Sequence, residues 1–346
     1  MKGVGILLIA SHNLAHTLGV TGYDCNEFYF DRESADTLFQ CILHPTGNLL
    51  IQLSTLLGYC GIHIFLFISA FGLVRKYEQG TAAMPAPHTF VWQHYAKLFR
   101  LMLPGFLAAL GAMALLPNLN IPGKKYLLTQ MLMIGNWFHP PYSHTFIGPY
   151  WFLGLMVELY VAYRLVLYVP QGGAGWRKWL LPVAFAALTL IPQFFWCTEN
   201  RTMIALRYNF FVAGLSFGAG LLVARYGGIP RMSRIGWACV WLLSCAAFIL
   251  MQHSSALWLL SALVAVVGII AFVKALPRAL TPPMVWSGKI SAFLFIVHPV
   301  VRYFAFPLRG VIENHLLIVL YLTVSLLLAA GYHRLAPHIP WPKFMK

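Results

Sequence analysis

Charged residues are scarce in this sequence of 346 residues. Asp, Glu, Lys and Arg together make up only 10% of it, whereas 60% of the residues are apolar. A soluble globular protein carries about a quarter charged residues, so a soluble enzyme is excluded. The sequence also lacks cysteines at metal or redox spacing and a cleavage site after its first apolar run. We therefore predict no metal site, and we expect the first apolar run to be its own insertion signal.

Acidic residues are the rarest charged type. There are nine of them against 24 Lys and Arg, which gives a formal net charge of +15. Such an excess could serve nucleic-acid binding, but the basic residues stand singly or in pairs at the ends of apolar runs. We therefore interpret them as topology signals and contacts with anionic lipids. The expected partners include a lipid bilayer and no nucleic acid.

Apolar runs of about 20 residues recur along the whole chain, and each is long enough to cross a hydrocarbon core of about 30 Å. We predict a single polytopic, all-α membrane domain over residues 1–346, with ten spans. No internal repeat is visible, which weakens the case for an inverted-repeat transporter without excluding it. The predicted spans lie at 3–20, 50–74, 98–116, 149–169, 179–196, 204–225, 234–251, 255–274, 286–306 and 314–333.

A further apolar piece, residues 126–138, suits an interfacial or re-entrant helix, because its 13 residues are too few for a crossing. If it does not cross, the inside loops and chain ends hold 17 of the 24 basic residues. If it does cross, every later loop changes side and this positive-inside bias is largely lost. We therefore predict that both termini are cytoplasmic.

The predicted outer loop, about residues 21–48, holds five of the nine acidic residues. We favour an acidic, solvated loop over a lid that contacts substrate. Cys25 and Cys41 both lie in this loop, outside the cytoplasm, where a disulfide could persist. A free pair of thiols is equally compatible with the sequence.

Ionisable side chains inside spans are costly and usually mark function. In the first span, His12 lies about 15 Å along the helix from Lys2, near the expected middle of the membrane. An imidazole, with an ordinary pKa of about 6.5, is suited to take a proton from a hydroxyl group. The alternative is a neutral histidine bonded to a helix carbonyl. His16, one turn further on the same face, is a second candidate.

The second and third spans carry further candidates. His63 stands in the second span among small and aromatic residues, and small residues often indicate no more than close helix packing. Lys97 and Arg100, at the predicted inner end of the third span, share a helix face. Paired cations facing the cytoplasm suit a donor that bears phosphates, although snorkelling and anchoring would explain them as well.

Two later spans contain an acid and a histidine–arginine pair. Glu158 lies near the middle of its span, where an unpaired charge is expensive. We expect it to be protonated, or paired with a histidine or arginine of another span. His298 and Arg302 are four residues apart on one face, in the outer half of their span.

Taken together and in this order, these segments resemble the bacterial membrane acyltransferase-3 family. Lys2-Gly-Val-Gly-Ile-Leu-Leu, leading to His12, is similar to the family's opening helix, in which a basic residue precedes a catalytic histidine. Phe65-Leu-Phe-Ile-Ser69-Ala-Phe71 is similar to its aromatic run in the second span. Three later matches are the basic pair before a proline (Lys97, Arg100, Pro104), the tryptophan and acid of the middle span (Trp151, Glu158), and the late histidine motif (Phe295-Ile-Val-His298-Pro).

Three departures from the family pattern stand out. Nine residues rather than ten separate Lys2 from His12, Ala70 replaces a glycine, and Lys97 replaces an arginine. The first departure matters most, because it turns the cation and the histidine about 80° apart around the helix instead of about 20°. A position of Lys2 outside the helix proper, on a flexible stem, would make up the difference.

The resemblance implies a multi-pass O-acyltransferase of the bacterial cytoplasmic membrane. It would move an acyl group, expected to be acetyl, from cytoplasmic acyl-CoA to a hydroxyl of a cell-envelope glycan or lipid-linked saccharide. Acetyl-CoA or another acyl-CoA is then a co-substrate, and no cofactor is bound permanently. The predicted site residues are His12 and Glu158 for catalysis, Lys97, Arg100, Lys2 and Ser69 for donor binding, and His298, Arg302 and His63 on the acceptor side.

We expect His12 to act as a general base or to carry the acyl group itself, with Glu158 orienting it if their spans meet. The alternative function is a proton-coupled secondary transporter or polysaccharide exporter, in which His12, Glu158 and His298 form a proton relay. That alternative explains the buried ionisable residues equally well. It explains the Lys97 and Arg100 pair less well.

Overall fold

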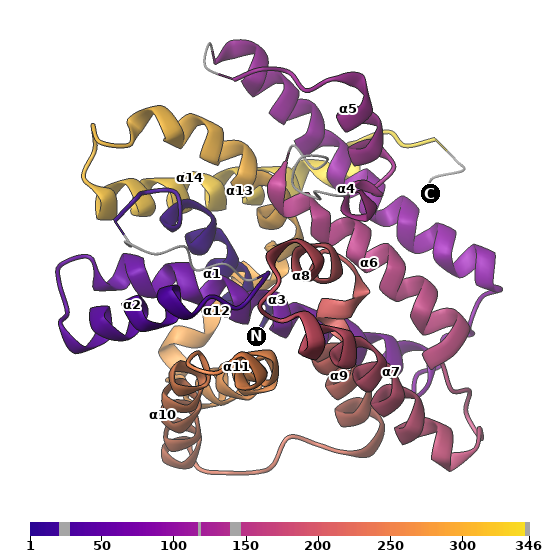
Figure 1. Cartoon of the computed structure of the whole chain (residues 1–346). Helices are drawn as coiled ribbons and strands as arrows, with labels where there is room; N and C mark the ends of the chain where they lie inside the picture. Colours follow the sequence, from indigo (N-terminus) through magenta and orange to yellow (C-terminus); the bar gives the residue numbers. More distant parts are fainter. Residues whose placement is uncertain (21–27, 117–118, 139–146, 343–346) are drawn as a thin grey trace.

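The computed structural model describes residues 1–20, 28–116, 119–138 and 147–342. Within these ranges the chain forms fourteen α-helices and no strand, so the all-α prediction is confirmed. Figure 1 shows how they are arranged. The helices are α1 (Lys2–Ala15), α2 (Arg32–Leu43), α3 (Leu49–Tyr77), α4 (Pro87–Leu115), α5 (Lys124–Met131), α6 (Trp151–Ala162), α7 (Gly175–Trp196), α8 (Asn200–Arg207), α9 (Gly214–Tyr226), α10 (Arg234–Met251), α11 (Ser255–Ala275), α12 (Thr281–Lys289), α13 (Ser291–Ala305) and α14 (Asn314–Leu335).

Eight helical segments among the described residues are long and apolar enough to cross a membrane. They are α3, α4, α7, α10, α11 and α14, together with α6 and α13 and the short turns that flank these two. Each coincides with one of the ten predicted spans. The protein is therefore a polytopic membrane protein, as its apolar runs predict.

Two predicted spans depart from the expectation. The first forms only the 14-residue helix α1, which is about 21 Å long and so shorter than a hydrocarbon core of about 30 Å. The span predicted at 204–225 is broken, because the segments Arg201–Arg207 and Phe210–Tyr226 meet at a bend of 70°. The side chains that hold this bend belong to the candidate site.

Two helix boundaries also differ from the prediction. α4 begins at Pro87, well before the predicted start of the third span, because proline suits the first turn of a helix. Lys97 and Arg100 consequently lie within α4 and not at its inner end. In the ninth predicted span, the separate helix α12 ends at Lys289 and the crossing helix α13 begins at Ser291.

Helix α3 is the centre of the bundle. It packs against α1, α9 and α11 (Figure 1). In its most apolar stretch of 18 residues, 61% is buried inside the protein, compared with 17% of the corresponding stretch of α10. Gly5 of α1 and Gly61 of α3 allow these two helices to approach closely. A Cβ atom at either glycine would lie 2.6 Å from an atom of the other helix. The small residues of the second span therefore have a packing role.

Two prolines inside helices free a backbone carbonyl, and a side chain from another helix satisfies each one. Pro104 leaves the Arg100 carbonyl without a helical donor, and the Tyr332 hydroxyl of α14 donates to it at 3.3 Å. Pro182 does the same in α7, where the carbonyl four residues earlier accepts from Arg225 at 2.9 Å. Membrane helices tolerate proline where such partners exist. These contacts tie α4 to α14 and α7 to α9.

The segment predicted as an acidic, solvated loop is partly folded onto the bundle. Asp31 caps α2 by accepting hydrogen bonds from the amides of Glu33 and Ser34. Just before it, Phe28 stacks on Tyr208 with ring centroids 4.2 Å apart. The described part of this segment, residues 28–48, is thus neither a loop nor solvated throughout, because aromatic residues beside the acids pack against the bundle. Of the two cysteines for which the sequence left a disulfide or free thiols open, Cys41 is a free thiol in α2 and Cys25 lies outside the described residues.

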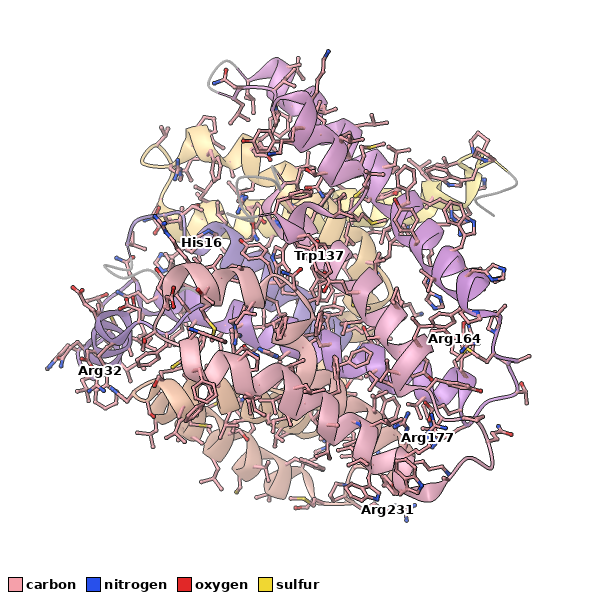
Figure 2. All side chains as sticks on the ribbon, turned by 45° about the vertical axis from the view of Figure 1, so that its right-hand side comes forward. His16, Arg32, Trp137, Arg164, Arg177 and Arg231 are labelled. Carbon is pink, nitrogen blue, oxygen red and sulfur yellow. The ribbon has the colours of Figure 1, made fainter. Side chains whose placement is uncertain are left out.

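The bundle has two distinct ends. Figure 2 shows Arg164, Arg177 and Arg231 at one side of the molecule and His16 and Arg32 at the other. The first three belong to the residues predicted to be cytoplasmic. Arg32 belongs to the predicted outer loop, and His16 lies in the half of the first predicted span that is nearer to this loop. We call these sides the basic end and the outer end.

The start of α1 and the last turns of α14 lie toward the basic end. Lys2, the first residue of α1, is within electrostatic range of Lys97. Tyr332, near the last turn of α14, donates to the carbonyl of Leu101 at 2.9 Å. The start of α1 and the last turns of α14 therefore share one side of the bundle, and the cytoplasmic location of that side stays a prediction.

The start of α4 and the end of α6 also meet at the basic end, because Arg164 donates to the Pro85 carbonyl at 3.0 Å. The other ends of these two helices, Leu115 and Trp151, accordingly lie at the outer end. Between them, the apolar piece at 126–138 contributes to α5, which has eight residues, and to a short turn after it.

Candidate functional site

His12 of α1 is held by the backbone of α3. Its side chain is buried, with 7% exposed, and Nδ1 lies 2.6 Å from the carbonyl oxygen of Thr55. A carbonyl only accepts hydrogen bonds, so Nδ1 carries a proton, and in the neutral ring Nε2 has the lone pair. The bond to Thr55 therefore fixes the tautomer in which Nε2 is the basic nitrogen.

The imidazole fits against α3 because Gly58 has no side chain. A Cβ atom at Gly58 would lie 2.2 Å from Cγ and 2.6 Å from Cβ of His12. Thr55 and Gly58 are three residues apart on one face of α3, which thus both orients the ring and makes room for it. His16 stacks on His12 with centroids 5.0 Å apart, but it is exposed and its Nδ1–H donates to the His12 carbonyl at 2.8 Å.

Helix α13 brings two further predicted residues to His12. His298 is fully buried, its Nδ1–H donates to the Leu294 carbonyl at 2.9 Å, and it lies within electrostatic range of His12. Arg302, one turn later, donates from Nη1 to the carbonyl of Asn13 at 3.1 Å. The structure therefore gathers His12, His298 and Arg302 between α1 and α13.

His63 is not part of this group. It follows Gly58 by five residues, which places it about 140° away around α3. There it faces α9, where its Nδ1 lies 2.8 Å from the Ser216 hydroxyl, and its ring packs edge-on against Tyr59. The structure does not bring His63 to the acceptor side of His12.

Glu158 binds the break between α8 and α9. One carboxylate oxygen accepts from the backbone amide of Phe210 at 2.8 Å, and the other accepts from the side-chain amide of Asn136. The same Asn136 amide donates to the Asn209 side-chain oxygen at 3.0 Å and to the Tyr208 carbonyl at 3.2 Å. Polar side chains thus satisfy the backbone groups that the 70° bend releases from the helix.

The expectation that Glu158 orients His12 is therefore wrong. Both of its oxygens are engaged at the helix break, and Thr55 orients the imidazole instead. It also forms no ion pair with a histidine or arginine of the described chain. The depth of Glu158 in the membrane can be derived from the sequence, but its hydrogen-bond partners on other segments cannot.

Four cations gather at the basic end. Lys97 is within electrostatic range of Lys2, Lys76 and Arg100, and Lys76 was not among the predicted residues. Arg100 folds back along α4, where its Nε donates to the Ala96 carbonyl at 3.3 Å. Because Met1 serves as the N-cap, Lys2 is part of α1 and does not stand outside it. Mutually repelling cations held at one end of a bundle favour an anionic ligand there.

Ser69, predicted to bind the donor, is half-buried on α3. It precedes Lys76 by seven residues, which puts both on one face of the helix and about 10 Å apart along it. Within the described part of the chain, its hydroxyl has no hydrogen-bond partner. Ser69 therefore lies between the cations of the basic end and the level of His12.

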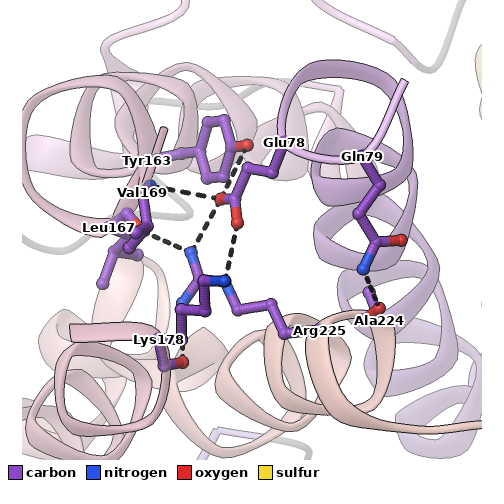
Figure 3. Close-up of polar contacts among 8 residues, drawn as sticks. All are labelled: Glu78, Gln79, Tyr163, Leu167, Val169, Lys178, Ala224 and Arg225. Atoms are coloured by element: carbon purple, nitrogen blue, oxygen red, sulfur yellow. Dashed lines mark hydrogen bonds and ion pairs between the residues drawn. The ribbon is translucent and has the colours of Figure 1, made fainter. Parts of the chain in front are cut away.

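A buried ion pair that the sequence did not reveal fastens the basic end. Figure 3 shows Glu78, at the end of α3, bound to Arg225 of α9, with Nη2 and Oε1 2.7 Å apart and side chains only 5% and 2% exposed. The Tyr163 hydroxyl donates to Glu78 at 3.1 Å, and Arg225 donates to the Leu167 carbonyl at 2.5 Å. The pair joins the end of α3 and α9 to the helical turn Tyr163–Leu167 that follows α6. The sequence clue to this pair was that Glu78 and Arg225 carry opposite charges at the ends of separate predicted spans.

The fold and the site define a multi-pass membrane protein with a buried histidine between helices and a cation cluster at one end. Comparison with protein families matches residues 1–334 to the acyltransferase-3 family, whose model is described as an acyltransferase domain. Because this match covers nearly the whole chain, the protein belongs to that family and is a membrane acyltransferase. No curated protein and no solved structure matches it. In the described residues, no group of three His, Cys, Asp or Glu side chains could hold a metal ion.

Proposed function

We propose that the protein is an O-acyltransferase of the bacterial cytoplasmic membrane. It moves an acyl group, most simply acetyl, from cytoplasmic acyl-CoA to a hydroxyl of a cell-envelope glycan or lipid-linked saccharide. The family supports acyl transfer. The observation that carries the finer proposal is the buried His12 imidazole, whose hydrogen bond to Thr55 leaves Nε2 as the base.

The proposed step needs only groups that are present in the protein and its two substrates. The acceptor hydroxyl gives its proton to Nε2 of His12 while its oxygen attacks the thioester carbonyl carbon. The carbon–sulfur bond then breaks, and the CoA thiolate takes the proton back from the imidazole. In the covalent variant, Nε2 itself first attacks the thioester carbonyl carbon and the CoA thiolate leaves. The acceptor oxygen then displaces the imidazole in a second step, and the proton of its hydroxyl passes to the thiolate.

The cations of the basic end support acyl-CoA as the donor. CoA carries its phosphates at one end of a long flexible arm and the thioester at the other. Lys2 lies about 15 Å from His12 along α1, so phosphates held by Lys2, Lys97 and Arg100 would leave the thioester free to reach the imidazole.

The transporter alternative depends on a proton relay through His12, Glu158 and His298. His298 does lie near His12. Glu158, however, is bound to Asn136 and Phe210, so the relay lacks its acidic member. This arrangement favours the enzyme.

The test uses detergent-purified protein with radiolabelled acetyl-CoA and a mixture of lipid-linked glycans. Label in the glycan fraction, or slow hydrolysis of acetyl-CoA in its absence, is the expected result. Protein that is folded but neither binds, transfers nor hydrolyses acetyl-CoA, and that instead moves saccharide in response to a proton gradient, would establish the transporter.

A further inference from the structure

Arg302 is a half-buried cation whose Nε atom is fully buried, and it lacks an anionic partner in the described part of the chain. Of its guanidinium nitrogens, Nη1 donates to the Asn13 carbonyl, and Nε has no hydrogen-bond partner among the described residues. The guanidinium lies over the Phe306 ring at 5.4 Å from its centroid. No carboxylate of the described chain forms an ion pair with it, in contrast to Arg225, which has Glu78.

Three neutral side chains around Arg302 also have unused polar atoms. Asn13 Oδ1, His298 Nε2 and the Tyr321 hydroxyl are buried without a hydrogen-bond partner in the described ranges. Asn13 and His298 flank Arg302 on α1 and α13, and Tyr321 of α14 packs in one buried cluster with Val301 and Ala305, which lie before and after Arg302 on α13. We call Asn13, His298, Arg302 and Tyr321 the Arg302 cluster.

Such a cluster is costly unless something completes it. A charge inside a membrane protein and buried polar groups without hydrogen bonds both oppose folding. Guanidinium groups bind carboxylates and phosphates through two parallel hydrogen bonds, and such pairs are among the strongest polar contacts in proteins. The group that completes the Arg302 cluster is therefore expected to be an anion with oxygen atoms.

The position of the cluster distinguishes between the two substrates. Along α1, Lys2 lies at the basic end and His12 follows. Asn13, and Thr17 just after the helix, lie beyond His12 toward the outer end. Arg302 binds the Asn13 carbonyl, so it lies on the far side of His12 from the cations proposed to bind CoA. An anion at the Arg302 cluster thus belongs with the acceptor and not with CoA.

We propose that Arg302 binds a carboxylate or phosphate group of the acceptor, and that this contact presents the acceptor hydroxyl to His12. The proposal rests on the proposed function, because it names the chemical class of the acceptor. It predicts that anionic saccharides or phosphate-linked saccharides are preferred over neutral ones. Unpaired Asn13, His298 and Tyr321 atoms supply additional hydrogen bonds to the sugar.

A structural role is the competing explanation, since a cation near the last turn of a helix stabilises its carbonyl groups. Arg309 provides a matched control for this role. Its Nη1 donates to the Thr17 carbonyl of the same segment at 2.8 Å, and its guanidinium lies over the same Phe306 ring at 4.7 Å. Unlike Arg302, it is exposed. Removing Arg309 therefore removes a similar structural contact without touching the proposed anion site.

The experiment measures binding of three amphiphiles to the full-length protein in a neutral detergent, with no acyl-CoA present. They are dodecyl glucoside, dodecyl glucuronide and a dodecyl phosphodiester of glucose. Wild type should bind at least one anionic compound about tenfold or more tightly than the neutral one, which is the size of effect expected of a charged hydrogen-bonded pair. Whichever anionic compound is preferred shows whether the acceptor offers a carboxylate or a phosphate.

The variants decide the role of Arg302. Arg302→Gln should lose the preference, whereas Arg309→Gln should retain it. Folding of Arg302→Gln is judged by size-exclusion chromatography. If it does not fold, the proposal is tested by the wild-type preference and by Tyr321→Phe, which should weaken binding of the preferred compound. Equal affinities for all three compounds in wild type would overturn the proposal, and so would a preference that survives in Arg302→Gln.

The same proteins are then assayed for label transfer from acetyl-CoA to each compound. A binding preference without any transfer or hydrolysis would contradict the proposed function and leave the anion site standing. Transfer at equal KM to neutral and anionic acceptors would support the function and overturn the anion site. An equal loss of kcat with every acceptor in Arg302→Gln would also overturn it, because Arg302 would then act on the reacting atoms or on the fold.

Discussion

Replacing Gly58 by alanine is expected to displace His12 without removing any chemical group from the site. The added Cβ would lie 2.2 Å from His12 Cγ and 2.6 Å from its Cβ. Carbon atoms in contact normally stay about 3.5–4.0 Å apart, so the two must separate by about 1 Å or more. The position of His12 Cβ is set by the backbone of α1, so rotation of the ring cannot relieve the overlap. The first helix itself has to move.

This displacement has a calculable cost. Overpacking of this kind destabilises a protein by about 1–3 kcal/mol. A misplacement of about 1 Å in a catalytic geometry can cost about 10²-fold in rate. We therefore expect Gly58→Ala to fold with a lowered unfolding temperature and to transfer acyl groups about 100-fold more slowly.

Gly72 on the same helix is the matched control, because a Cβ atom there would have no neighbour within 4 Å. Initial rates of label transfer from acetyl-CoA, acetyl-CoA affinity and thermal unfolding in detergent are measured for both variants. Gly72→Ala should match wild type in rate. A wild-type rate in folded Gly58→Ala would refute the assignment of the base to His12 at this position against α3.

Substitutions at two further places test the proposed donor site at the basic end and the break between α8 and α9. Neutralising Lys97 and Arg100 together should raise the KM for acetyl-CoA more than it lowers kcat, because contacts to CoA phosphates are made in the ground and transition states alike. Arg75→Gln, which removes an exposed cation at the basic end, serves as the control. An unchanged KM in the double variant would mean that Lys97 and Arg100 anchor the helix and do not bind acetyl-CoA. Glu158→Gln should keep most of the activity, since an amide oxygen can still accept from Phe210, whereas Glu158→Ala should lose about 1–3 kcal/mol of stability. A near-complete loss of transfer in stable Glu158→Gln would restore its predicted catalytic role.

The fold class could be predicted because it depends on composition and length alone. Apolar runs of membrane-crossing length recur in the sequence, and eight of the predicted spans are helices of that kind. The family, too, was recognisable from the order of its motifs, and the match over residues 1–334 confirms it.

Site residues could be predicted only where their depth, counted along one helix, was enough to place them. His12 and His298 could be placed by counting residues from the ends of their spans, and the structure brings them together. Partners on other helices could not be predicted in this way. The hydrogen bond from His12 goes to a backbone carbonyl of Thr55, a group that every residue carries and that no side-chain pattern marks.

The helix break at Tyr208 and Asn209 was missed for a related reason. A hydropathy window averages over the break, since its residues are apolar enough on both sides. The bend depends on Glu158 and Asn136, which are distant in sequence and together engage the Phe210 amide and the Tyr208 carbonyl. One sequence without its contacts could not assign Glu158 to this role.

The central claim is that His12 supplies the base or carries the acyl group, and its neighbour His16 gives the sharpest comparison. Single-turnover transfer of label from acetyl-CoA is measured for wild type, His12→Gln and His16→Gln, with acetyl-CoA binding measured on the same samples. His12→Gln should bind acetyl-CoA normally and lose about 10² to 10⁴ in rate, as removal of a general base typically does. His16→Gln should transfer at close to the wild-type rate, because its ring is exposed and stacks on His12 from outside. Transfer by His12→Gln at the wild-type rate would contradict the claim.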